Sequence, residues 1–179
     1  MSTAAIRTHS LARARHLGAP SHRPILAKRT FSALTFVLAP PNAVWFALTD
    51  PAATARYWNH AIRSSWQPGE RWDHLRTDGS GVADAGGIVL ALERPRHLDF
   101  TFGPSRVPAY EGASRVHVTL TPTRTMTRID LRHEGLRDER EFERAALGWS
   151  AMLAGLKTYL EVGRPLPREL WEITPSRRG

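Results

Sequence analysis

The sequence of 179 residues contains no cysteine. This absence excludes disulfides, thiolate metal sites and cysteine nucleophiles, and it argues against a secreted fold held together by disulfides. The sequence also lacks any apolar run of the roughly 18 to 20 residues that a membrane-spanning helix needs. We therefore expect a cytoplasmic protein without a membrane span, long enough for one domain to bury its own core.

Acidic residues are missing from the start of the chain, where Asp50 is the first. Residues 1–29 carry six of the 25 Lys and Arg residues, so the remaining 19 nearly balance the 17 acidic residues. Most of the net charge of +8 thus belongs to a basic N-terminal tail, which argues against nucleic-acid binding by the folded body. We expect residues 1–29 to be disordered; a targeting segment or a misplaced start codon are the open alternatives.

Strand and helix signals begin after this tail. The β-forming stretch 30–38 predicts a strand, after which Asn42 and Asp50 are candidate N-caps of two short helices. Alternating apolar and polar residues then predict further strands at residues 70–77, 87–92, 97–102, 114–121 and 125–134. The last two strands should form an antiparallel hairpin, because a short turn-forming segment joins them.

A long helix is predicted from Asp138 to Val162, with Gly163 as its C-cap. Its apolar side chains recur at steps of three and four residues, which places them on one face. The pattern predicts an α+β domain over residues 30–163, in which a curved antiparallel sheet grips the C-terminal helix and leaves a cavity. Residues 164–179 form a C-terminal tail, whose Leu170, Trp171 and Ile173 are expected to pack back on the body.

Several motifs resemble the SRPBCC superfamily, also called START-like or helix-grip proteins. They are Val44-Trp45, Leu48-Thr49-Asp50-Pro51, Trp66, Pro68-Gly69, Asp78-Gly79, Gly87–Leu90, Pro95–Leu98, Thr127–Ile129, His133–Leu136, Gly148-Trp149, Leu153, Leu156-Lys157, Tyr159–Glu161 and Gly163. Together they are similar to the branch named after the activator of the heat-shock protein 90 ATPase. The resemblance covers about residues 30–163 and implies the helix-grip fold with a cavity, but it carries over no catalytic motif.

Two histidines are expected inside this cavity. His133 follows Ile129 and Leu131 onto the inner face of its strand. His74 is two residues after Trp72, so alternation places both side chains on the same face, which is the inner one if Trp72 points inward. Burial favours neutral imidazoles, which suit general-base catalysis or hydrogen bonding to a ligand. The alternative is that each histidine only satisfies a backbone group or lies at the rim.

The remaining predicted lining is aromatic and aliphatic. The full set is Trp58, Trp66, Trp72, Phe100, Phe102, Val118, Leu131, His133, Trp149, Met152, Leu153 and Leu156. For Trp58, Trp66 and Trp72, the pattern fits pocket lining and core packing equally well. The loop of residues 103–113 is a candidate gate. The spacing of histidines and carboxylates predicts no metal site, and no cofactor motif is present.

Three functions remain open at this point. The leading hypothesis is binding of a small hydrophobic or aromatic ligand in the cavity, without catalysis. The second is an enzyme of cyclase or hydratase type that uses His133 with His74. The third is a chaperone-interaction module, by analogy with the co-chaperone that names the branch. We expect a monomer or a homodimer.

Overall fold

The computed structural model describes residues 28–104 and 113–171, so most of the predicted tail 1–29 and most of the predicted gate 103–113 lie outside the described residues. Its strands are β1 (Arg29–Val37), β2 (His60–Ser64), β3 (Arg71–Arg76), β4 (Ala83–Glu93), β5 (His97–Pro104), β6 (Ser114–Pro122) and β7 (Thr127–Leu136). Its helices are α1 (Pro41–Thr49), α2 (Pro51–Tyr57), α3 (Glu139–Val162) and the 3-10 helix η1 (Arg168–Trp171).

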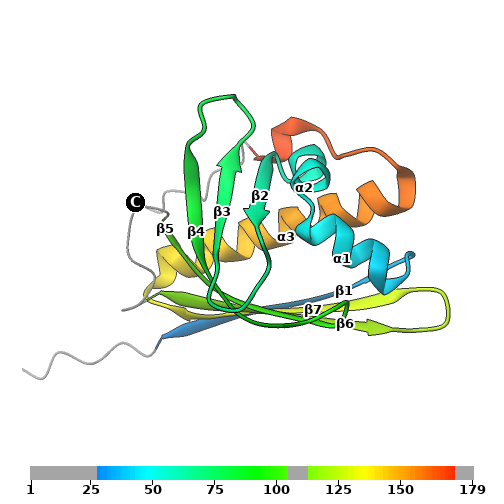
Figure 1. Cartoon of the computed structure of the whole chain (residues 1–179), viewed down its shortest axis with the longest axis horizontal. Helices are drawn as coiled ribbons and strands as arrows, with labels where there is room; N and C mark the ends of the chain where they lie inside the picture. The colour runs from blue at the N-terminus through cyan, green and yellow to red at the C-terminus, as the bar shows by residue number, and fades with distance from the viewer. Residues whose placement is uncertain (1–27, 105–112, 172–179) are drawn as a thin grey trace, which may run out of the picture.

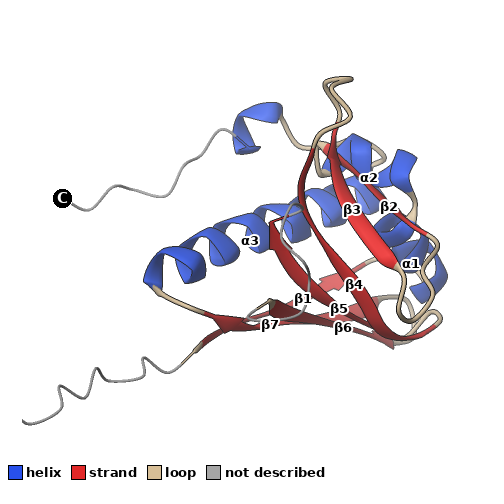
Figure 2. Cartoon of the chain, turned by 60° about the vertical axis from the view of Figure 1, so that its left-hand side comes forward, coloured by secondary structure: helices blue, strands red, loops and turns tan. Residues whose placement is uncertain are grey.

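The seven strands form one antiparallel sheet in the order β1-β7-β6-β5-β4-β3-β2. The sheet curves around α3, which runs along its inner side, while α1 and α2 cover one end (Figure 1). Figure 2 shows the same curvature from another side, with β3 and β4 rising away from the floor formed by β1, β6 and β7. The predicted helix-grip α+β fold is therefore confirmed. No helix in the described part of the chain is both long and apolar enough to cross a membrane.

The two short helices begin in different ways. Asp50 caps α2 as predicted, because its Oδ1 accepts a hydrogen bond of 2.8 Å from the backbone N–H of Ala53. The prediction of Asn42 as the cap of α1 is wrong. That helix begins at Pro41, whose fixed φ suits the first helical position, and no side chain caps it.

Strand β2 was not expected from the sequence, because its five residues show only weak alternation. Tertiary contacts hold it in place. The chain turns into β2 at Asn59, which adopts a positive φ of 58°. Ile62 is buried, and its backbone N–H donates a 3.0 Å hydrogen bond to Oγ1 of Thr54 in α2. This bond ties the edge of the sheet to α2 and fixes His60 beside β3.

The inner face of the sheet follows the predicted alternation. Val118 on β6 and Ile129 and Leu131 on β7 are buried, and so are Thr127 and His133, which share the phase of the β7 residues. Thr127 is satisfied because its hydroxyl donates a 2.7 Å hydrogen bond to the carbonyl of Ala39. The predicted hairpin is confirmed by the antiparallel pairing of β6 with β7.

One carboxylate is buried on the opposite, outer face of the sheet. Asp99 on β5 is 5% exposed, and its oxygens lie 2.9 Å from Arg115 Nη2 and 2.7 Å from His117 Nδ1. His97 Nε2 lies 3.0 Å from the same carboxylate. The guanidinium of Arg115 supplies the opposite charge for Asp99 across β5 and β6, so this carboxylate serves the outer surface of the sheet rather than the space under α3.

Helix α3 has both predicted caps. Asp138 accepts a 2.8 Å hydrogen bond from the N–H of Glu141, and Gly163 ends the helix with φ of 76°. Its buried face, which includes Met152, faces the sheet. After the helix, Trp171 in η1 packs against the core, as expected, whereas Ile173 lies outside the described residues.

The last turns of α3 also cover the open edge of β1. Lys157 Nζ donates a 2.7 Å hydrogen bond to the carbonyl of Phe36, and Oε1 of Glu161 accepts one of 2.7 Å from the N–H of Leu38. Lys157 and Glu161 also pair with each other at 2.7 Å. Backbone groups that would otherwise offer a template for another strand are thereby occupied.

Candidate functional site

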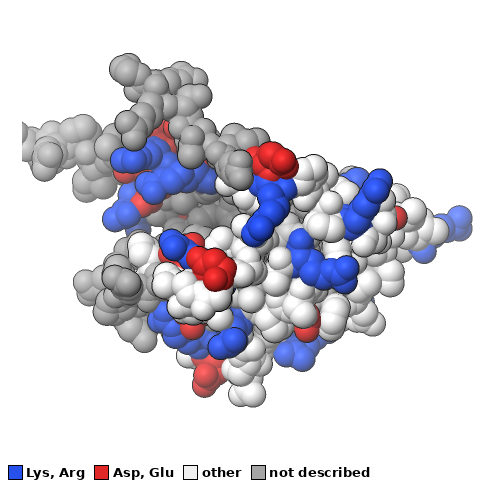
Figure 3. Space-filling model, turned by 90° about the horizontal axis from the view of Figure 1, so that it is seen from above, with Lys and Arg blue, Asp and Glu red and all other residues white. Residues whose placement is uncertain are grey.

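A cavity of about 470 Å³ lies between the first half of α3 and one end of the sheet. Its aromatic walls are Trp58, Phe102, Trp149 and Trp171. Its polar lining comprises His60, His74, Asp84, Ser114, His133, Arg137, Glu141 and Arg144. The view in Figure 3 shows charged side chains of both signs bordering a hollow, in keeping with the arginines and carboxylates in this lining.

The structure divides the predicted site residues into three groups. Trp58, His74, Phe102, His133 and Trp149 line this cavity. A second, apolar space of only about 30 Å³ is lined by Trp66, Trp72, Phe100, Val118 and Met152, together with Trp58 and Trp149. Leu131, Leu153 and Leu156 line neither space and belong to the core.

The tryptophans of the second group are anchored by the backbone. Trp66 Nε1 donates to the carbonyl of Thr49 at 2.9 Å, and Trp72 Nε1 donates to that of Thr101 at 2.9 Å. A space of about 30 Å³ holds roughly one water molecule. These two side chains therefore pack the core beneath the larger cavity.

The wall of the larger cavity is a continuous set of rings. The ring centroids of Trp58 and Trp149 lie 5.5 Å apart, and those of Phe102 and Trp149 lie 5.7 Å apart. Phe102 also contacts His133, with centroids 5.3 Å apart. Such tilted and edge-to-face contacts favour fixed orientations of aromatic side chains, so they give the wall a defined shape.

His133 has both ring nitrogens engaged. Trp149 Nε1 lies 2.8 Å from His133 Nδ1, and Ser114 Oγ lies 2.7 Å from His133 Nε2. An indole N–H can only donate, so Nδ1 must be the acceptor and the proton of the neutral ring sits on Nε2. Ser114 Oγ in turn donates a 2.8 Å hydrogen bond to the carbonyl of Phe102. The bonds form one directed chain from Trp149 through His133 and Ser114 to Phe102.

This direction limits what His133 can do chemically. Burial lowers the pKa of His133 from 6.5 to about 4, although the charge of Glu141 acts in the opposite sense. Protonation would also place a hydrogen on Nδ1, opposite the N–H of Trp149. In a serine hydrolase the histidine accepts the serine proton, whereas here the histidine donates to Ser114. The pair therefore does not activate Ser114 as a nucleophile.

His74 lies between two rings at the other side of the cavity. It stacks on His60, with centroids 3.9 Å apart, and contacts Trp58 at 4.8 Å. Burial, and next the charge of His60, lower its pKa from 6.5 to about 3, while Asp84 opposes the shift. Its Nε2 atom is buried without a hydrogen-bond partner among the described residues. His74 is therefore a neutral ring at neutral pH.

Sequence reasoning missed the charged group next to His74. Asp84 Oδ2 lies 3.0 Å from His60 Nε2, and Arg76 donates to Asp84 through Nε and Nη2 at 2.9 and 2.6 Å. The pKa of Asp84 is lowered to about 2, mainly by the hydrogen bonds from Arg76. No sequence signal joined these residues, because His60 lies on the unpredicted strand β2.

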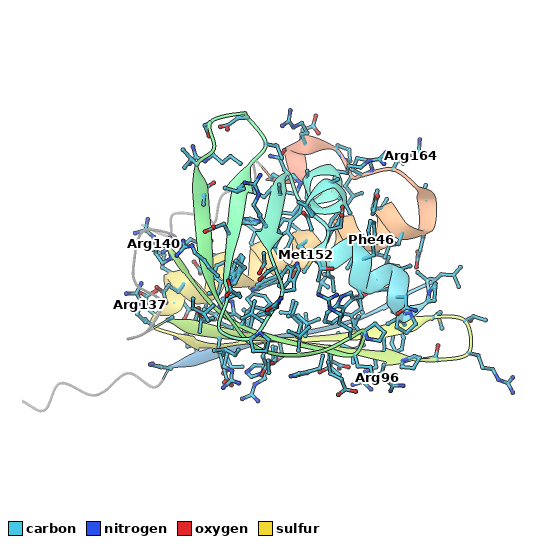
Figure 4. The ribbon with its side chains drawn as sticks, in the orientation of Figure 1. Phe46, Arg96, Arg137, Arg140, Met152 and Arg164 are labelled. Carbon is cyan, nitrogen blue, oxygen red and sulfur yellow. The ribbon has the colours of Figure 1, made fainter. Side chains whose placement is uncertain are left out.

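A second charged group borders the cavity at the start of α3. Arg137 pairs with Glu141 and thereby lowers the pKa of that carboxyl. Arg144, one turn further along, also lines the cavity. Figure 4 labels Arg137 and Arg140 beside this end of α3, and of these two only Arg137 lines the cavity. The sequence pattern did not place Glu141 in the cavity, so its position in the lining is known from the structure alone.

Residues 38–161 match the family described as "Activator of Hsp90 ATPase homolog 1-like protein". The chain belongs to this family. The predicted membership of the SRPBCC superfamily and of this branch is thereby confirmed.

Solved structures agree with this assignment. CalU16 from Micromonospora echinospora is 25% identical, with a TM-score of 0.63 over 81% of each chain. MLL2253 from Mesorhizobium loti is 28% identical, with a TM-score of 0.63 over 75% of this chain and 98% of that one. The Aha1 dimer from Colwellia psychrerythraea has the same TM-score and coverage at 18% identity, which shows the fold alone. The comparison with curated proteins gives no significant match.

Proposed function

We propose that this family member binds a small hydrophobic or aromatic molecule in the cavity under α3. The supporting observation is the cavity itself, whose volume of about 470 Å³ lies within the range of roughly 300 to 1,000 Å³ that is usual for ligand sites. Trp58, Phe102 and Trp149 offer flat apolar surfaces, and a few polar groups interrupt them. This combination suits a ligand with an aromatic body.

Binding can be followed through tryptophan fluorescence, because Trp58 and Trp149 lie in the wall. We expect saturable quenching by naphthalene-type probes. Gly148 also lines the cavity, and a Cβ atom at this position would meet no atom of the described residues within 4 Å. The substitution Gly148→Leu should therefore fill the cavity and weaken binding by about tenfold or more, since each tenfold corresponds to about 1.4 kcal/mol.

Ala154→Leu is the matched control, because Ala154 is exposed on the same helix and does not line the cavity. This variant should bind as the unchanged protein does. If Gly148→Leu and Ala154→Leu bind every probe equally well, the ligand does not occupy the cavity. If no probe binds to the unchanged protein, the proposal fails altogether.

A cyclase or hydratase activity is the second candidate, since His74 and His133 do line one cavity. Two features disfavour it. The pKa values of His133 and His74 are lowered to about 4 and about 3, far from the value near 7 that suits a general base at neutral pH. The Nδ1 lone pair of His133 is also occupied by Trp149. Binding without catalysis therefore accounts better for the arrangement.

A chaperone-interaction role has less support. It rests on the family description, and within the described residues the exposed apolar side chains are spread over several elements, with Phe46 on α1 among the most exposed (Figure 4). The solved Aha1 relative is described as a dimer, so a homodimer stays a proposal beside a monomer. A cytoplasmic location is also a proposal, supported by the absence of cysteine.

A further inference from the structure

We propose that the cavity selects ligands whose polar group is a hydrogen-bond donor, such as a phenolic hydroxyl, and that Ser114 accepts this bond. The inference rests on the proposed function and specifies the chemistry of the ligand. It follows from the direction of the hydrogen bonds between Trp149, His133, Ser114 and Phe102.

The direction is fixed at both ends of the chain. At one end, the N–H of Trp149 cannot accept, so it forces His133 to carry its proton on Nε2 and to donate to Ser114. At the other end, the carbonyl of Phe102 cannot donate, so it must receive the hydroxyl proton of Ser114. No alternative arrangement of protons satisfies all three contacts.

Among the residues that the structure describes, the hydroxyl of Ser114 keeps one free acceptor position. A serine hydroxyl has one proton and two lone pairs. The proton points to Phe102 and His133 takes one lone pair, which leaves the second lone pair. Ser114 is half-buried and lines the cavity, so a ligand can meet this lone pair.

Only a donor forms a favourable bond at this position. A ligand hydroxyl or N–H would complete the coordination of Ser114. A carbonyl or ether oxygen would instead face the lone pair, with no proton between the two acceptors, and would lose its bonds to water without replacement. Trp149 and His133 act here as positioning residues, because they set the direction in which Ser114 can bond.

The test uses two probes with the same ring system, 2-naphthol and 2-methoxynaphthalene. In the second probe a methyl group replaces the hydroxyl proton, so its oxygen can only accept a hydrogen bond. Dissociation constants are measured by calorimetry for the full chain. We expect 2-naphthol to bind at least about tenfold more tightly. Ser114→Ala removes the acceptor and leaves the Nε2–H of His133 facing the cavity, so the preference should vanish or turn toward the ether.

Three further variants separate positioning from mere packing. Ser114→Thr retains the hydroxyl and should keep the preference. Ser150→Ala makes the same change as Ser114→Ala at an exposed position of α3 outside the cavity, and should also keep it. Trp149→Phe leaves Ser114 intact but frees the tautomer of His133, so the preference should fall although the acceptor is still present. Thermal unfolding verifies that each variant is folded.

The outcomes distinguish this inference from the proposed function. If the unchanged protein binds both probes equally, or if Ser114→Ala keeps the tenfold preference, donor selection by Ser114 is refuted while ligand binding stands. If neither probe binds to the unchanged protein, both proposals are overturned together.

Discussion

Two glycines of α3 should respond in opposite ways to the same substitution. Alanine is more favourable than glycine inside a helix by about 0.5 to 1 kcal/mol, because glycine loses more backbone freedom on folding. At Gly148, which lines the cavity, an added Cβ would meet no atom within 4 Å in the part of the chain that the structure describes. Gly148→Ala should therefore gain the full helix preference and raise the free energy of unfolding by roughly that amount.

At Gly155 the added Cβ would lie 2.9 Å from the backbone carbonyl oxygen of Tyr57 and 3.5 Å from its ring. A backbone atom in α2 cannot rotate away, so α3 would have to move from α2. Overpacking of this kind costs about 1 to 3 kcal/mol, which exceeds the gain in helix preference. Gly155→Ala should therefore lower the free energy of unfolding by about 1 to 2 kcal/mol.

Urea unfolding and thermal melting test this pair directly. For a chain of this size, 1 kcal/mol corresponds to about 2 to 4 °C in Tm. Gly148→Ala should thus melt higher and Gly155→Ala lower than the unchanged protein. The two sites lie about 10 Å apart along the helix, so the double variant should show the sum of the effects. A Tm of Gly155→Ala equal to or above that of the unchanged protein would refute the close approach of α2 and α3.

Two further predictions concern pH and the open edge of β1. The pKa of His133 is lowered from 6.5 to about 4 in the folded state, so the unfolded chain takes up its proton first as the pH falls. This difference contributes on the order of 3 kcal/mol to the free energy of unfolding above pH 6.5, and the contribution should be lost as the pH falls towards 4. Urea unfolding across this range should show that the free energy of unfolding of His133→Gln depends less on pH than that of the unchanged protein. Lys157→Ala frees the carbonyl of Phe36, so light scattering should show more self-association at high protein concentration. An unchanged molecular mass would mean that Lys157 does not protect the edge.

The sequence predicted those parts of the fold that depend on local periodicity. The stripe through Trp149 and the alternation along β6 and β7 repeat over many residues, so chance seldom produces them. The caps Asp138 and Gly163 are single residues, but their types strongly favour helix ends. Strand β2 was not predicted because it is short and because its hydrogen bond from Ile62 to Thr54 is a tertiary contact that no local pattern encodes. The cap of α1 was misjudged because Pro41 takes the first helical position itself.

For the candidate site, alternation placed His74 and His133 on inner faces, and both line the cavity. The groups around them come from pairing between strands. Asp84 on β4 reaches across β3 to His60 on β2, and Ser114 is at the start of β6, where its hydroxyl meets His133 of the paired strand β7. Periodicity assigns a face to each side chain, but it does not say which neighbours meet across the sheet.

The hydrogen bond between Trp149 and His133 is a contact of this kind, and it bears on the proposed function. From the sequence, an inward histidine in an apolar pocket fits a general base and a binding group equally well. A helix residue that only donates removes one of these options, because it occupies the lone pair that a base would need at Nδ1. The same bond directs the proton of His133 towards Ser114 and leaves an acceptor in the cavity. Trp149, which closes the aromatic wall, therefore supports the proposed role in recognition over one in proton transfer. Trp149→Phe should weaken donor selection and raise the pKa of His133 in a single substitution, which NMR titration of its ring can measure.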